Sequence, residues 1–426
     1  MKKLREVQVS MRTALTMCAA AGAVTAVICI LATGWSSHEI GSKLHEIDRL
    51  VSDKYIGELD EDSVADYAAT GYIAGLGDKW SSYIPAESYE AYRLSGEGKG
   101  CGIGVSVTST DTSIRVTLVY DDSPAAKAGI EKGDYILGTG GLTVEKDGSS
   151  AVIGAISGEE GTDVAVTVQK ADGTTKDLTM QRALVTQKMA WGKMLTDRVG
   201  YIRIENFHSG CAEQFKAALQ SLTDSGTQSL VIDVRHNGGG RVKEMSEALD
   251  PLLGEGTIMT LRMKDGAETV YSSDADCIDL PIAVLIDDQS ISAAEFFAAA
   301  LQEYDRATLV GTHTTGKGRA QRTYQLSDGS AVNLSVEEYF TPKGKSLADV
   351  GIAPDIEVKL TDEQTQNFFF LTPKTDPQLQ KAMEKNGVPY VSHVYDNAPH
   401  SISTGCGTDA EGWLNEAVAF WEEQTK

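Results

Sequence analysis

The sequence predicts a multidomain chain made of an N-terminal membrane anchor, a helical segment, a β-rich domain and an α/β core. Three observations support this prediction. A long uncharged segment follows a basic N-terminus, short alternating strands begin near Cys101, and strands alternate with helices from Gly200 onward. The 426 residues are enough for two or three domains, because one domain usually takes roughly 100 to 200 residues.

The charge of the chain excludes some classes of function. It holds 38 basic and 61 acidic residues, which gives a formal net charge of −23. Nucleic-acid and anionic-lipid binders need a basic face that neutralises phosphate, so neither class is expected. The seven histidines form no HExxH pattern and the cysteines no CxxC pair, so no metal and no cofactor is expected.

The first 37 residues predict a cytoplasmic tail (1–12) and a transmembrane anchor (13–35). Residues 13–37 carry no ionisable acid or base, and a span needs about 20 apolar residues. The lysines and arginines before it favour a cytoplasmic N-terminus, which makes the chain a single-pass cell-membrane protein with its other domains extracytoplasmic. Cys18 and Cys29 are then ordinary membrane residues. A cleaved signal peptide is the alternative.

Residues 36–95 are expected to be helical. Leu44, Ile47, Val51 and Tyr55 recur at helical spacing, and a second set of apolar residues does so after an acidic turn. The remaining cysteines are widely spaced, and the sequence leaves their pairing open; they are Cys101, Cys211, Cys277 and Cys406.

Residues 96–182 are predicted to form a β-rich domain. Short alternating runs such as "IRVTLVY" and "VAVTVQK" are separated by glycine and aspartate turns. The glycine-rich stretch "GIGV" leaves backbone N–H groups unblocked, and these could capture a terminal carboxylate while the next strand pairs with a peptide. "GIGV" and "SPAAKAGIEKGDYIL" together resemble a PDZ domain of the permuted bacterial kind. The resemblance implies that substrate C-termini bind at Gly102, Ile103, Gly104 and Val105.

From Gly200 the sequence predicts buried strands joined by helices, which indicates an α/β core. Within it, Ser292 starts a helix directly after an apolar strand, and Lys317 stands between two glycines after another. A serine hydroxyl becomes a good nucleophile only when a base takes its proton. A lysine can act as that base if burial lowers its pKa enough to make it neutral. We therefore expect the two side chains to meet at adjacent strand ends.

Several segments resemble the carboxyl-terminal processing, or tail-specific, serine proteases. "SISAAE" is similar to their nucleophile segment, and the glycine-flanked lysine follows at the family's spacing. "GYIRIENF", "DVRHNGGG" and "YFTPKGKSLADVGIAPDIEV" match further segments, so the resemblance covers residues 44–360. It implies a ClpP/crotonase-like protease core over residues 183–362, with Ser292 as nucleophile, Lys317 as base and Gln321 orienting the lysine.

The oxyanion hole is less closely defined by the sequence. Its expected donors are the backbone N–H groups of Ala293, next to the nucleophile, and Gly239 in the glycine loop, although Gly238 or Gly240 would serve as well. Two residues depart from the family. Ala294 replaces a usual serine, and Ile291, often smaller in relatives, could alter the substrate pocket.

Two alternative hypotheses stay open at this point. One is a Ser-His-Asp triad, in which a histidine serves as base; the candidates are His208, His236 and His313, oriented by Asp233 or Asp287. The other is a binding-only PDZ protein on the same fold, which would have no need of Ser292, Lys317 and Gln321.

The preferred hypothesis is a membrane-anchored extracytoplasmic serine endopeptidase. Its expected partners are proteins or peptides with free, apolar C-termini, together with the membrane. The C-terminal extension, residues 363–426, contains helical patterns and could be an oligomer contact or a lid.

Overall fold

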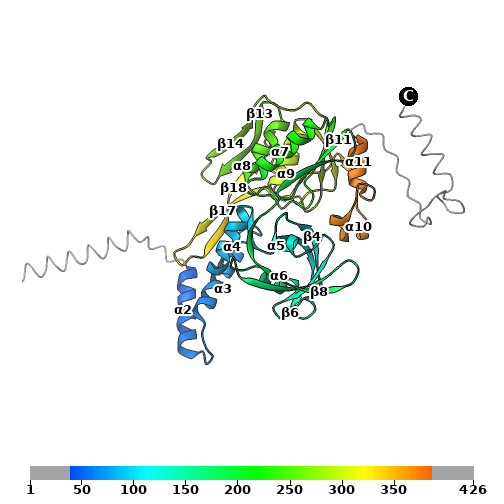
Figure 1. The fold of residues 1–426 in the computed structure, drawn as a ribbon. Coiled ribbons are helices and arrows are strands. Elements are labelled where there is room, and N and C mark those ends of the chain that lie inside the picture. Colours follow the sequence, from blue (N-terminus) through cyan, green and yellow to red (C-terminus); the bar gives the residue numbers. More distant parts are fainter. Residues whose placement is uncertain (1–38, 386–426) are drawn as a thin grey trace, which may run out of the picture. The chain divides into compact units, whose positions relative to one another are not determined.

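The computed structural model describes residues 39–385 (Figure 1). The chain divides into two compact units, and the second begins at Ala68. The first contains α2 (Glu39–Lys54) and the start of α3 (Glu61–Ala74), which confirms two predicted helices. Within residues 39–385 no helix is both long and apolar enough to cross a bilayer. The predicted anchor, 13–35, lies outside the described residues, as does the amphipathic pattern near the C-terminus.

In the second unit, an antiparallel sheet in the order β3-β4-β5-β7-β8 forms the β-rich domain. Strand β7 alternates buried side chains with more exposed ones, as a half-buried strand requires, and a cluster of mainly Ile and Val side chains fills the interior of the domain. The elements are β2 (Lys99–Gly102), β3 (Val105–Thr110), β4 (Ser113–Val119), α5 (Pro124–Lys127), β5 (Tyr135–Thr139), β6 (Leu142–Thr143), α6 (Val144–Ile156), β7 (Asp163–Gln169), β8 (Thr175–Gln181) and β9 (Ala183–Thr186).

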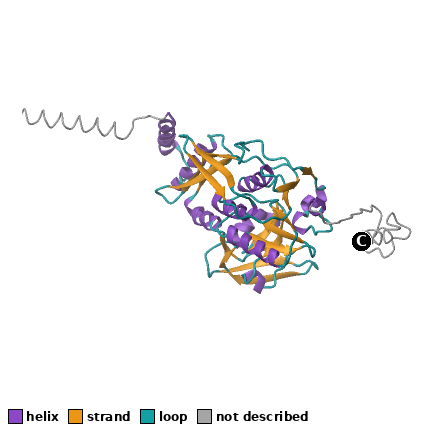
Figure 2. Ribbon diagram, turned by 90° about the horizontal axis from the view of Figure 1, so that it is seen from above, coloured by secondary structure: helices purple, strands orange, loops and turns teal. Residues whose placement is uncertain are grey.

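The α/β core is a six-stranded sheet in the order β10-β11-β12-β15-β16-β19, parallel except for β10. Figure 2 distinguishes its strands from the surrounding helices. The elements are β10 (Ala190–Met194), β11 (Val199–Ile204), α7 (Cys211–Asp224), β12 (Ser229–Asp233), α8 (Val242–Leu249), η1 (Asp250–Leu252), β15 (Ile282–Ile286), α9 (Ala293–Glu303), β16 (Ala307–Gly311), β19 (Ile356–Glu357), α10 (Asp362–Gln366), η2 (Phe368–Phe370) and α11 (Pro377–Lys385).

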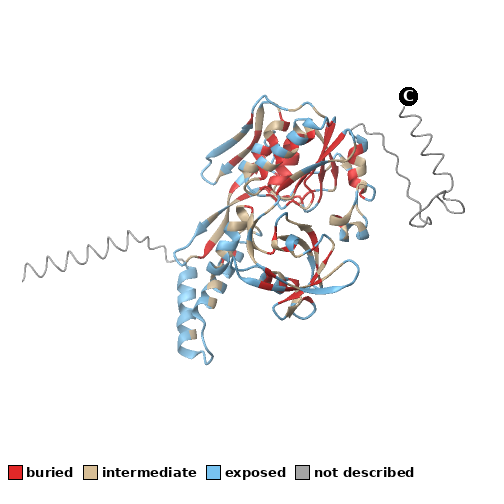
Figure 3. Cartoon of the chain, in the orientation of Figure 1, coloured by how far each residue is buried: buried red, intermediate tan, exposed pale blue. Residues whose placement is uncertain are grey.

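Both faces of the central strands are buried, which explains why these strands are mostly apolar. Ile202, Ile232 and Val284 pack with the residues of α7, α8 and α9, whereas Tyr201 and Val231 face the side covered by α11. Figure 3 shows the burial concentrated in these strands and in α9. The C-terminal extension therefore contributes a helix, α11, to the core. For this helix, packing against the sheet is a sufficient role, and the predicted lid or oligomer contact is not needed to explain it.

A second sheet extends from the core in the order β1-β18-β13-β14, with β17 paired to β18. It brings an early segment of the chain beside a late one, because β1 runs antiparallel to β18. The elements are β1 (Ser82–Ile84), α4 (Ala86–Gly96), β13 (Gly256–Met263), β14 (Glu268–Ser273), β17 (Arg319–Gln325) and β18 (Ala331–Phe340).

Candidate active site

The candidate site lies where three neighbouring parallel strands end. Asp233 of β12 pairs with Leu285 of β15, and Ile286 of β15 pairs with Gly311 of β16. The glycine loop, the serine loop and the lysine loop follow β12, β15 and β16. Since the carboxyl ends of parallel strands share one edge, the three loops meet there. The expected origin of Ser292 and Lys317 at adjacent strand ends is confirmed.

Ser292 occupies a strained turn from strand to helix. Its φ of 57° and ψ of −117° lie in a region that residues other than glycine rarely adopt, and only 4% of the residue is exposed. In its strained backbone this strand-to-helix turn is similar to a nucleophile elbow, although the G-x-S-x-G sequence is missing. Tyr339 hydrogen-bonds to the Ser292 side chain, and burial raises the pKa of this tyrosine to about 12.

Glu295 joins the serine loop to the lysine loop. Its fully buried carboxylate accepts hydrogen bonds from the backbone N–H of Ser292 at 2.8 Å, Gly316 at 2.7 Å and Lys317 at 2.8 Å. The Thr314 hydroxyl donates a fourth at 2.6 Å. Polar groups away from water need a hydrogen-bond partner. By accepting from both loops, this single side chain fixes the position of one loop relative to the other.

The glycines beside Lys317 allow close backbone contacts, as the sequence predicts. A Cβ on Gly318 would lie 2.3 Å from the Ala348 nitrogen, and Gly316 adopts a φ of 85°. Burial lowers the pKa of Lys317, while Asp78 and Glu295 act in the opposite sense. The Lys317 Nζ lies 4.7 Å from the centroid of the Trp80 ring. Within residues 39–385, no hydrogen bond links Lys317 to Ser292.

Gln321 has other partners in this conformation. Its side-chain amide donates to the Ser335 hydroxyl at 2.9 Å and to the Arg319 carbonyl at 2.9 Å. No hydrogen bond from Gln321 to Lys317 occurs in the described part of the chain, so the orienting role of Gln321 stays a prediction.

The two predicted oxyanion donors lie side by side. A Cβ on Gly239 would meet the Ala293 nitrogen at 3.2 Å and the Ser292 Cβ at 2.9 Å. The Ala293 N–H has no acceptor among the described residues, but the Gly239 N–H donates to Asn237 Oδ1 at 2.8 Å. The Ala293 N–H is therefore available to an acceptor, whereas the Gly239 N–H would first have to give up its hydrogen bond to Asn237.

The histidines do not complete a triad with Ser292 in this structure. His236 Nδ1 lies 2.5 Å from Asp287 Oδ2, and its ring stacks on Phe368 with the centroids 4.1 Å apart. Asp233 instead accepts from Tyr201, Arg203 and Arg235. His208 and His313 have backbone partners. Among the described contacts no histidine bonds to Ser292, so this conformation contains no Ser-His pair.

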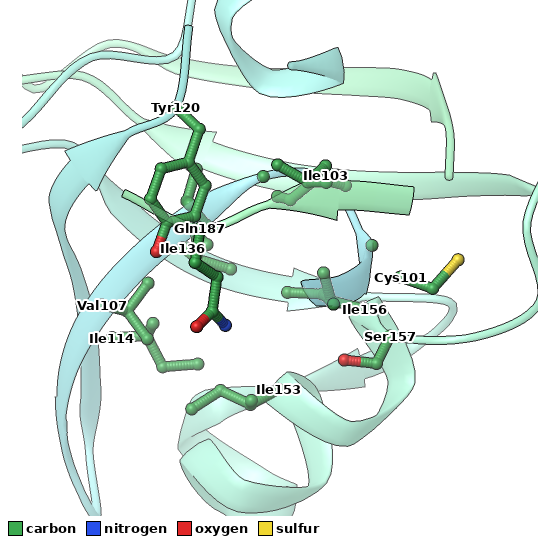
Figure 4. Close-up of a pocket in the computed structure, with 15 residues that line it drawn as sticks. Cys101, Ile103, Val107, Ile114, Tyr120, Ile136, Ile153, Ile156, Ser157 and Gln187 are labelled. Atoms are coloured by element: carbon green, nitrogen blue, oxygen red, sulfur yellow. The ribbon is translucent and has the colours of Figure 1, made fainter. Parts of the chain in front are cut away.

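The β-rich domain contains a cavity of about 180 Å³, which is bordered by the predicted carboxylate loop. Figure 4 shows the side chains that line it. Ile103 and Gly104 lie between β2 and β3, and their backbone N–H groups have no acceptor among the described residues. β3 forms an edge of its sheet, since within residues 39–385 its one strand partner is β4. The wall is mainly aliphatic and comes from the strands and from α6; it includes Val107, Ile114, Ile136, Ile153 and Ile156.

The cysteines within residues 39–385 are free thiols: Cys101, Cys211 and Cys277. Cys211 is buried in the core, and this burial raises the pKa of its thiol to about 12. Cys406 lies outside the described residues.

Sequence reasoning missed two parts of the site. Glu295 stood inside the nucleophile segment, and a lone acid in an apolar helix pattern was the available signal that it has a buried role. Trp80 and Asp78 lie far from Lys317 along the chain, and only the pairing of β1 with β18 brings them close. No local pattern could have revealed that proximity.

The fold and the comparisons define the class as a serine peptidase that carries a PDZ domain. Residues 198–358 match the model of peptidase family S41, and residues 101–181 match that of the PDZ domain. These matches confirm the resemblance to the carboxyl-terminal processing proteases that was seen in the sequence.

Individual relatives agree with this assignment. The carboxy-terminal processing protease CtpA of Bacillus subtilis is 29% identical over 322 residues, which cover 75% of this chain and 69% of the relative. A probable CtpA-like serine protease of Staphylococcus aureus is 27% identical over 358 residues, covering 81% and 72%.

One solved structure shows a similar fold, and a second matches with a lower TM-score. A putative S41 protease from Bacteroides fragilis superposes with a TM-score of 0.53 at 17% identity, covering 79% of this chain and 99% of that one. A photosystem II D1 C-terminal processing protease gives a TM-score of 0.48 at 26% identity, covering 74% and 86%.

Proposed function

We propose that this protease cleaves peptide bonds through an acyl-enzyme on Ser292, with Lys317 as general base. The observation that supports this most strongly is the Glu295 carboxylate, which accepts from the backbone N–H of both Ser292 and Lys317. A protein that only binds peptides has no use for a buried acid that fixes a serine and a half-buried lysine in register. The strained turn at Ser292 supports the same conclusion.

In the proposed reaction, neutral Lys317 takes the proton of the Ser292 hydroxyl as Oγ attacks the substrate carbonyl carbon. The negative charge that forms on the carbonyl oxygen is stabilised by the Ala293 N–H and by a donor from the glycine loop. Lys317 then gives its proton to the departing amine, and the C–N bond breaks. A water molecule, deprotonated by Lys317, hydrolyses the ester and restores Ser292.

Within the same proposal, the PDZ domain selects substrates by their C-termini. The free N–H groups of Ile103 and Gly104 would bind the terminal carboxylate, and the last residues would pair with the β3 edge. The aliphatic wall of the cavity favours an apolar final side chain. A charged final side chain would be disfavoured, because it would lose its hydration there.

An amidated substrate is therefore expected to be cut about tenfold to a hundredfold more slowly than its free-acid parent. A hydrogen bond to a charged group is worth roughly 1.5 to 3 kcal/mol, and each 1.4 kcal/mol corresponds to a factor of ten. The measurement is kcat/KM for a pair of unstructured substrates that differ only in the terminal carboxyl. A third substrate, extended by one aspartate, should also be cut slowly.

Two controls accompany this comparison. Deletion of residues 96–182 should shrink the difference between the two tails, and equal rates in the intact protein would contradict carboxylate capture. The Ser292→Ala protein should cut neither substrate, and cleavage by it would rule out Ser292 as the nucleophile.

Membrane anchoring by residues 13–35 with extracytoplasmic catalytic domains is also part of the proposal, and it rests on the uncharged segment and the basic residues before it. A reporter fused after Lys426 should be active only outside the cytoplasm, and the chain should stay with membranes after a high-salt wash. Release of a shortened soluble form would instead support a cleaved signal peptide.

A further inference from the structure

A turn formed by residues 78–81 lies against Lys317. The Trp80 ring centroid is 4.7 Å from Lys317 Nζ and 4.9 Å from Lys79 Nζ. An aromatic ring attracts a cation at this distance through its quadrupole, most strongly when water is excluded. Trp80 is only partly exposed, so its indole both touches the ammonium and shields it from solvent.

The turn is fixed on both sides of Trp80. Asp78 accepts from the Trp80 backbone N–H at 3.1 Å and from the Ser81 hydroxyl at 2.6 Å. The Ser81 oxygen in turn accepts from the Ser335 backbone N–H at 3.0 Å, and β1 continues the attachment by pairing with β18. Strand β18 also pairs with β17, which begins two residues after Lys317. The same sheet therefore positions both the Trp80 ring and the Lys317 ammonium.

We propose that Trp80 is a positioning residue that holds the Lys317 ammonium beside its ring, and that Lys317 leaves this ring to reach Ser292 during catalysis. The inference rests on the proposed Ser-Lys mechanism and adds to it a contact on the other side of the lysine. It accounts for Lys317 having an aromatic partner while no hydrogen bond joins it to Ser292 within residues 39–385.

The ring has two opposing effects on the lysine. Its face favours the charged ammonium, whereas its bulk excludes water and so disfavours charge. The charged neighbours act alongside it. Asp78 and Glu295 favour the ammonium, Arg319 offsets the charge of Asp78, and Lys79 competes for the same ring. A variant that loses only the aromatic face should therefore lower the pKa of Lys317, whereas a variant that also loses the bulk of the side chain should raise it.

Trp80→Phe and Trp80→Leu form a matched pair, since the two side chains have similar volume and only one has a π-face. We expect Lys317 of the leucine variant to titrate about half a pH unit to one pH unit lower than that of the phenylalanine variant. In Trp80→Ala, water reaches the amine and Lys317 should titrate above both. A residue that merely fills space would give the same titration with phenylalanine and leucine.

The titration can be read without activity. Full-length protein carrying Ser292→Ala is labelled with acetic anhydride across a range of pH, and the modification of Lys317 is quantified by mass spectrometry. Trp191→Leu, whose indole packs near Tyr201 at 5.8 Å between centroids, is the control and should leave Lys317 unchanged. Equal titration in the phenylalanine and leucine variants would overturn the proposal.

In proteins that keep Ser292, the acidic limb of the plot of kcat/KM against pH should move with the pKa of Lys317. It should lie at the lowest pH in Trp80→Leu, higher in Trp80→Phe and highest in Trp80→Ala. Failure of the two proposals is distinguishable. If labelling separates phenylalanine from leucine but the Lys317→Ala protein still cleaves, the Trp80 contact stands and the lysine-base mechanism is wrong. If Lys317→Ala is inactive and the limbs of the two variants coincide, the mechanism stands and the positioning role is wrong.

Discussion

Replacing Lys317 with arginine is expected to reduce kcat/KM by about a hundredfold to ten thousandfold, the usual contribution of general acid–base catalysis. A guanidinium keeps its proton at any pH that a protein tolerates, so it cannot take the proton of Ser292. The fold should survive, because a guanidinium also binds an aromatic face and can remain beside Trp80. Cleavage of an unstructured protein and the melting temperature are the two measurements.

Lys343→Arg is the matched control, because Lys343 is an exposed lysine on the same domain and should tolerate the change. Lys317→Met adds a variant of similar length without charge, which should be equally inactive and at least as stable, since no ammonium is then buried. Activity within tenfold of wild type in Lys317→Arg would overturn the assignment of Lys317 as base.

Glu295→Gln is expected to damage both stability and catalysis. The carboxylate accepts four hydrogen bonds from buried donors. A glutamine keeps one acceptor oxygen and turns an NH₂ group toward N–H groups that already donate. Hydrogen bonds to charged groups are worth more than neutral ones, and unpaired buried donors are costly, so a loss of roughly 2 to 4 kcal/mol is expected.

For a core of this size, that loss should lower the melting temperature by roughly 5 to 10 °C. Activity should fall about a hundredfold even at temperatures where the protein is folded, because a small displacement of reacting groups has that effect. Glu247→Gln, on the exposed side of α8, is the control and should change neither property. A Glu295→Gln protein with native stability and activity would show that the two loops are held by other contacts.

The sequence by itself determined the main elements and the resemblance to a protease family. Apolar runs identified the buried strands β12, β15 and β16, because a parallel sheet covered on both faces leaves few positions for polar side chains. Ser292 at the start of a helix and the flanking glycines of Lys317 are local patterns, and the structure places them on neighbouring strand ends as expected. The PDZ and protease segments were likewise readable, since their motifs are short and contiguous.

The tertiary structure alone decided how the site residues are held. The partners of Lys317, Gln321 and Gly239 are Trp80, Ser335 and Asn237, and these contacts depend on the approach of loops and on one pairing of strands. The pairing of β1 with β18 joins distant segments through backbone hydrogen bonds, which carry no signature in the side chains. Sequence patterns report which face of an element is buried, but contacts between distant segments are set by the packing of the whole core, so the surroundings of Lys317 could be learned only from the folded chain.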